Sequence, residues 1–105
     1  VWLDPLPMNG FLGAMRARSF GEFRRCFEQW PLMPLNVVYA DADGTTGWQL
    51  VGQLPERKGG HGLLPRPADR PDSGWAGLVP FDRMPFAENP ERGFWATAND
   101  DPGAS

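Results

Sequence analysis

An Asp-Gly turn between two runs of β-branched and aromatic residues is the feature that most limits how this chain can fold. Val37–Tyr39 and Trp48–Val51 are rich in residue types that favour strands, and Asp41–Gly44 lies between them. Glycine in such a turn tolerates the positive φ angle that the chain reversal requires. The pattern predicts an antiparallel β-hairpin within the longer segment Asn36–Arg57.

A helix is predicted just before the hairpin. Ser19 and Glu22 have the spacing of a capping box, in which each side chain accepts a hydrogen bond from a free amide of the first turn. Four aromatic residues then recur at the spacing of one helical face: Phe20, Phe23, Phe27 and Trp30. Pro31 is expected to end the helix after about three turns.

Composition predicts a small, loop-rich unit. The 105 residues allow one domain at most. The 13 Gly and 12 Pro residues are typical of irregular structure, whereas the five Trp and seven Phe argue against disorder. Between Glu56 and Glu91 no periodicity is sustained, and this stretch is expected to be an ordered excursion that lies on other parts of a larger protein. Phe94–Ala98 is expected to form a further strand.

Charge and targeting signals exclude several classes of partner. A net charge of −3 and an isoelectric point near 5.0 provide no basic surface, so no nucleic acid is expected as a partner. Neither a signal peptide nor an apolar run of about 18 residues is present, and no membrane contact is expected. Cys26 is the single cysteine, so an internal disulfide is excluded and the redox compartment stays open.

Three short patterns could suggest a reactive site, and each has a plainer interpretation. The Asp41–Gly44 turn resembles the start of a calcium loop, but the sixth position is Thr46 and the twelfth is Gly52 instead of Gly and Glu. His61 has no suitable partner nearby and is expected to be an exposed loop residue. Cys26 has no evident base to activate it and is expected to be a packing residue.

Three segments, in this order, resemble the penicillin acylase family. They are NVVYADADGTTGWQLVGQLPER at Asn36–Arg57, the Trp-x-Gly-x-x-Pro-Phe stretch at Trp75–Phe81, and GFWATANDDP at Gly93–Pro102. The family consists of N-terminal-nucleophile amidohydrolases and includes acyl-homoserine-lactone acylases. The resemblance implies an α+β piece of an α/β/β/α sandwich, with one helix, a hairpin, a further strand and long loops. Residues 1–105 would be a partial domain of the β chain.

The resemblance also implies a reaction. In this family a serine at the N-terminus of a processed chain takes the acyl group from a linear amide, its own α-amino group serves as the base, and water then releases the acid. This chain begins with Val1, so the nucleophile is expected outside it and the piece alone is expected to be inactive. Its expected partners are the α chain, the rest of the β chain and a small amide substrate.

Three residues are assigned roles through the resemblance. By local pattern alone, Asn99 is a turn former after a strand. The resemblance implies that its side-chain amide donates to the oxyanion of the tetrahedral intermediate. Leu35 and Phe11 would border the acyl pocket, which takes a phenylacetyl or a long aliphatic group, although Phe11 replaces a tryptophan common in the family. Both could equally be core residues.

The resemblance also implies a cofactor and a compartment, and one alternative function is kept beside it. Calcium occurs in some members of the family but is bound mainly by residues outside a segment like this one, so no metal ligand is assigned. Family members are mostly exported, which implies a periplasmic or secreted protein. The alternative is a non-catalytic, aromatic-rich β module that binds a peptide or a glycan through its five tryptophans.

Overall fold

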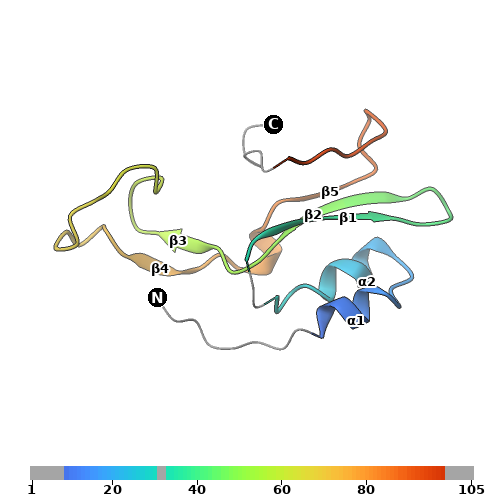
Figure 1. Cartoon of the computed structure of the whole chain (residues 1–105), viewed down its shortest axis with the longest axis horizontal. Helices are drawn as coiled ribbons and strands as arrows, with labels where there is room; N and C mark the ends of the chain where they lie inside the picture. Colours follow the sequence, from blue (N-terminus) through green and yellow to red (C-terminus); the bar gives the residue numbers. More distant parts are fainter. Residues whose placement is uncertain (1–8, 31–32, 99–105) are drawn as a thin grey trace.

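The computed structural model describes residues 9–30 and 33–98 and has an α+β architecture, as predicted. Two short helices lie on one side of a three-stranded antiparallel sheet with the strand order β1-β2-β5, and a two-stranded sheet, β3-β4, extends to one end (Figure 1). The elements are α1 (Gly10–Ala14), α2 (Phe20–Arg25), β1 (Leu35–Ala40), β2 (Thr46–Val51), β3 (Pro55–Arg57), β4 (Trp75–Leu78), the 3₁₀ helix η1 (Phe81–Arg83) and β5 (Phe86–Glu88). Within the described residues no helix is long and apolar enough to cross a membrane.

The predicted hairpin is confirmed as β1 and β2. Tyr39 pairs with Gly47 in the antiparallel register, and Leu35 pairs with Val51 at the open end. Gly44 has a φ angle of +89°, the conformation that the Asp-Gly pattern predicts. Side chains alternate between the two faces of the sheet, so Val51 joins Phe27 and Trp30 in a buried core on the helix side.

The start of α2 is as predicted, but its end is not. The Ser19 hydroxyl accepts a hydrogen bond from the Glu22 amide at 3.2 Å, whereas the Glu22 carboxylate accepts from the amide of Arg18 at 2.8 Å. The α-helix ends at Arg25, and the chain continues to Trp30 in tighter turns with bonds between residues three apart. These turns still place Phe27 and Trp30 in the core, so the aromatic pattern correctly predicted burial and overestimated the helix.

The proline- and glycine-rich stretch contains more regular structure than its sequence pattern predicts. It forms β3, β4, η1 and β5, and the β3-β4 pair projects away from the three-stranded sheet (Figure 1). In the loop between β3 and β4, His61 is exposed, as predicted, and Leu63 and Leu64 are 87% and 79% exposed. The expectation that this stretch lies on other parts of a larger protein stays a prediction.

The strand predicted at Phe94–Ala98 is wrong. None of these residues belongs to a strand, and the strand that pairs with β2 on the side opposite β1 is β5. The segment instead runs back over the side of the sheet that faces away from the helices, where it follows the turn after β5 (Figure 1). Trp95 stacks there on Trp48 of β2, with ring centroids 6.2 Å apart and an interplanar angle of 29°.

Candidate functional site

An apolar groove lies between α1, α2 and β1. Its volume is about 350 Å³, and it is lined mainly by Phe11, Met15, Phe23, Phe27, Val37 and Val38. Phe11 forms one wall, with its ring edge-on to Trp30 at 4.7 Å and to Phe27 at 6.0 Å. About half of the Phe11 side chain is exposed, so the ring is fixed by its aromatic neighbours and remains accessible to a ligand.

The other two residues predicted for the site have different positions. Leu35 opens β1 and packs, half-buried, against the core formed by Phe27, Trp30 and Val51. It therefore supports the aromatic residues behind the groove and does not line the groove itself. Asn99 lies outside the described residues, and the described chain reaches Ala98.

The close contact between α1 and the end of α2 holds Phe11 in place. A Cβ atom added to Gly10 would lie 2.1 Å from the carbonyl oxygen of Cys26, far inside any permitted contact. Glycine is therefore needed for α1 to approach α2 so closely. Because Phe11 follows Gly10 directly, this contact sets the position of the groove wall.

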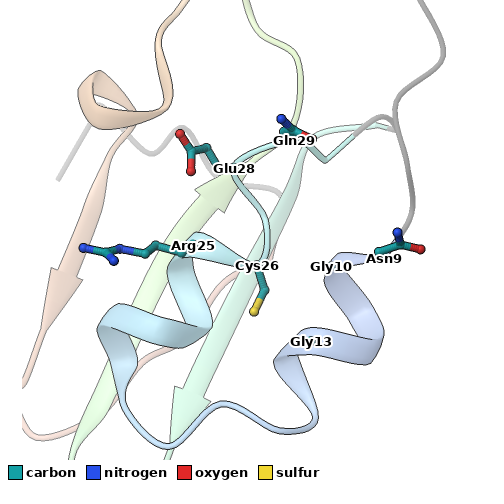
Figure 2. A pocket seen from close by; sticks show the side chains of 7 residues that line it. All are labelled: Asn9, Gly10, Gly13, Arg25, Cys26, Glu28 and Gln29. Atoms are coloured by element: carbon teal, nitrogen blue, oxygen red, sulfur yellow. The ribbon is translucent and has the colours of Figure 1, made fainter.

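A second, polar hollow lies on the other side of this contact. It has a volume of about 370 Å³, and Figure 2 shows the residues that line it: Asn9, Gly10, Gly13, Arg25, Cys26, Glu28 and Gln29. The thiol of Cys26 points toward Gly13 (Figure 2). It donates a hydrogen bond to the backbone carbonyl of Glu22 at 3.2 Å. The structure thus supports the prediction that Cys26 is a packing residue, since its hydrogen bond goes to the backbone and not to a base.

Arg24 and Gln49 form a polar link that the sequence analysis missed. Nε of Arg24 donates to Oε1 of Gln49 at 2.6 Å, and Gln49 is completely buried in β2. Nε2 of Gln49 in turn donates to the carbonyl oxygens of Leu50 at 2.7 Å and Pro85 at 3.2 Å. A glutamine within an otherwise apolar strand was the one signal available for this link, because a buried amide needs partners.

The guanidinium of Arg24 also packs on an aromatic ring. It lies 3.3 Å from the ring centroid of Phe86 in β5. Burial lowers the pKa of Arg24 from its usual value, and the charges of Asp82 and Glu88 oppose this shift. Arg24 therefore ties α2 to β2 and β5, which places it in the scaffold and not in the groove.

In the turn between β1 and β2, the carboxylate of Asp41 stabilises the turn through hydrogen bonds. Oδ1 of Asp41 accepts hydrogen bonds from the amides of Asp43 at 3.0 Å and Thr45 at 2.9 Å, and Oδ2 accepts from the Tyr39 hydroxyl at 3.0 Å. The Thr45 amide, followed by the other donors, lowers the pKa of Asp41. Among the described residues no group of three or more His, Cys, Asp and Glu side chains could hold a metal ion.

Comparison with known proteins gives consistent results. The model of the penicillin amidase family matches residues 1–105. Acyl-homoserine lactone acylase QuiP of Pseudomonas aeruginosa is 35% identical over 92 residues, which are 88% of this chain and 11% of that protein. Penicillin G acylase of Escherichia coli is 34% identical over 89 residues, which are 84% of this chain and 10% of that protein. This chain therefore spans about a tenth of the length of these relatives.

The fold is also similar to a solved structure. The thermostable penicillin G acylase from Alcaligenes faecalis matches with a TM-score of 0.67 and 27% sequence identity. The match covers 89% of this chain and 17% of that chain.

Proposed function

Because this chain belongs to the penicillin amidase family, we propose that it is one part of an amidohydrolase that cleaves linear amides of the penicillin or N-acyl-homoserine-lactone type. The acyl group is transferred to a serine at the N-terminus of a processed chain, and water then releases it as an acid. Since the chain spans about a tenth of its relatives, the serine and the rest of the active site belong to other segments.

In this reaction Asn99 is the donor to the oxyanion. A negative charge develops on the carbonyl oxygen only as the serine attacks, so a fixed amide donor at that point stabilises the transition state more than the substrate. The assignment is supported by the family match, which includes residue 99, and by the resemblance of Gly93–Pro102 to the family sequence.

The observation that carries the substrate side of the proposal is the apolar groove beside Phe11. An aliphatic or aromatic acyl group that binds in such a groove removes apolar surface from water, and the free energy of that burial favours binding. Phe11 would contact the acyl group directly. Leu35 would not contact it but would pack against Phe27 and Trp30, the aromatic residues that hold Phe11 in place. The amide itself would lie toward the part of the enzyme that supplies the serine.

Replacing Phe11 by alanine in the complete enzyme is expected to lower kcat/KM about fivefold for amides with long acyl groups, because the loss of half a buried aromatic side chain costs about 1 kcal/mol. The effect should shrink as the acyl chain is shortened. The matched control is Leu12→Ala, since Leu12 follows in the same helix, is 68% exposed and does not line the groove. Equal losses in both variants, or no dependence on acyl length, would contradict a role for the groove in binding.

The relatives and the solved neighbour are all named as acylases, which favours the amidohydrolase over a non-catalytic peptide- or glycan-binding module. We also propose that the complete protein is periplasmic or secreted and that any calcium is held by residues of other segments. Fractionation of the producing cell and metal analysis of the purified enzyme test these two points.

A further inference from the structure

The β3-β4 pair and the loop between its strands, residues 55–78, form an arm that projects from the three-stranded sheet (Figure 1). At the base of the arm the Val79 amide donates to the Leu54 carbonyl at 2.8 Å, and Nη2 of Arg83 lies 3.0 Å from Oε1 of Glu56. In the described chain β4 pairs with β3 and with no other strand, and all four of its residues are exposed. Because a two-stranded sheet is at best marginally stable in water, the arm needs a further layer to cover it.

The loop of the arm, residues 58–74, is held in shape by its own polar contacts. The carboxylate of Asp72 is paired with the guanidinium of Arg66, and its Oδ1 lies 3.3 Å from Nε of Arg70. The hydrogen bond from Arg66 lowers the pKa of Asp72. The Ser73 hydroxyl donates to the carbonyl oxygen of Pro67 at 2.6 Å. The surface that the loop presents is therefore formed before anything binds to it.

This loop presents two neighbouring leucines to the outside. Leu63 and Leu64 are 87% and 79% exposed. They border a hollow of about 680 Å³, whose lining combines apolar and cationic side chains: Leu63, Leu64, Pro65, Pro67, Arg66 and Arg70. Contiguous apolar side chains with a polar rim mark surfaces that another protein segment covers.

A smaller, polar hollow adjoins the first one at Leu64. Its volume is about 190 Å³, and the guanidinium groups of Arg57 and Arg66 line it. Arg66 is paired with Asp72, whereas Arg57 is exposed and forms no ion pair with any residue that the structure describes. A Cβ atom at Gly62 would lie 2.7 Å from Cζ of Arg57, so glycine allows this guanidinium to lie against the loop. The smaller hollow thus offers an unpaired cation next to an apolar side chain.

Charge and chain length indicate what covers this surface. Residues 57–74 contain four Arg or Lys and two Asp, although the whole chain has a net charge of −3, so this part of the chain attracts an acidic partner. This chain spans about a tenth of its relatives, and the structural match covers 17% of the solved acylase chain. Most of such an enzyme therefore lies outside these residues. Since the arm needs its cover in every molecule, a segment of the same enzyme meets the need better than a separate partner, which binds according to its concentration.

We propose that the surface formed by Leu63, Leu64 and Arg57 is the docking site for another segment of the same enzyme, outside residues 1–105, in which an apolar side chain lies next to an Asp or Glu. The apolar side chain fills the larger hollow beside the two leucines, and the carboxylate pairs with Arg57 in the smaller one. The proposal rests on the chain being one part of a larger enzyme, as proposed above, and not on the reaction of that enzyme.

Hydroxyl-radical footprinting of the complete enzyme tests whether the leucines are covered. The oxidation rates of Leu63 and Leu64 are measured by mass spectrometry in the native enzyme and in the enzyme unfolded by denaturant. Covered leucines are expected to oxidise at least about tenfold more slowly in the native enzyme, at every enzyme concentration. Similar rates in the two states would show that the leucines remain in water, and protection lost on dilution would show that a second copy covers them. Either result overturns the proposal.

The charge of the partner is tested with Arg57→Glu in the complete enzyme, with Arg57→Lys as the matched control. Glutamate repels a facing carboxylate, whereas lysine keeps the charge, so Arg57→Glu is expected to raise the native oxidation rate of Leu64 about fivefold or more and Arg57→Lys less than about twofold. Arg57→Gln removes the charge without reversing it and should give a smaller increase than Arg57→Glu. An unchanged rate in both folded Arg57→Glu and folded Arg57→Gln would overturn the acidic partner.

The footprint does not depend on amide hydrolysis, which is assayed in parallel on the same samples. A parent enzyme that protects Leu63 and Leu64 but hydrolyses no N-acyl amide would remove the proposed reaction and leave the docking site standing. An active enzyme with freely oxidised leucines would do the reverse. The failure of this proposal and the failure of the proposed function are therefore distinguishable.

Discussion

Replacing Asn99 by alanine in the complete enzyme is expected to lower kcat by about 10²–10³, the usual cost of losing one oxyanion donor. The substrate carbonyl carries little charge before attack, so KM should change far less than kcat. The measurement is steady-state hydrolysis of one N-acyl amide by the parent and by the variant at the same degree of processing.

The matched control for Asn99→Ala is Asn9→Ala. Asn9 is also an asparagine, but its side chain is exposed, makes no capping hydrogen bond to α1 and does not line the apolar groove. Asn9→Ala should therefore leave kcat nearly unchanged. A similar kcat for Asn99→Ala and for the parent would mean that another group stabilises the oxyanion.

The second large effect is expected for Gly10→Ala. The added methyl group would overlap the Cys26 carbonyl oxygen, and a backbone atom cannot turn aside as a side chain can. Overpacking of this kind costs about 1–3 kcal/mol, and here α1 must separate from α2 to relieve it. We expect faster hydrogen exchange in residues 10–15 and a loss of binding of long acyl groups at least as large as that for Phe11→Ala.

Gly13→Ala provides the control for Gly10→Ala within the same helix. A Cβ atom at Gly13 would lie 3.0 Å from Sγ of Cys26, which is the end of a side chain and can shift slightly. Alanine also favours the helix by up to about 1 kcal/mol relative to glycine. Hydrogen exchange in α1 should therefore be little changed or slower. Equal disruption by both substitutions would show that the Gly10–Cys26 contact is not the critical one.

Local sequence signals predicted the elements that are determined by local interactions. The hairpin follows from strand-forming runs on either side of Gly44, and the start of α2 follows from Ser19 and Glu22. The strands β3, β4 and β5 are only three or four residues long and exist through pairing with distant segments. No pattern within Glu56–Glu91 could reveal those pairings, because they depend on the tertiary arrangement.

The prediction of a strand at Phe94–Ala98 failed for a related reason. Aromatic and β-branched residues suit a pleated surface, but a strand also needs a neighbour with free hydrogen-bonding groups. In the structure β5 pairs with β2, whereas Phe94–Ala98 pairs with no strand and Trp95 stacks on Trp48 of β2. The same residue types that suggested a strand therefore serve as a packing anchor.

The candidate site could be predicted only in part. Phe11 was assigned through the resemblance, and the structure gives it a groove that no local pattern indicated. The groove is formed by α1, α2 and β1, so its lining residues come from separate segments of the chain. Leu35 packs, half-buried, against the core formed by Phe27, Trp30 and Val51 and does not line this groove, and its assignment to the acyl pocket stays a prediction.

The central claim is that the complete enzyme transfers the acyl group to a nucleophile before water releases it. The most direct test measures how the acyl group is divided between water and added hydroxylamine, for two amides with the same acyl group but different amines. A shared acyl-enzyme predicts one ratio of hydroxamate to acid for both amides, whichever step limits the rate. Ratios that differ between the two amides would contradict a common acyl-enzyme and, with it, the proposed reaction.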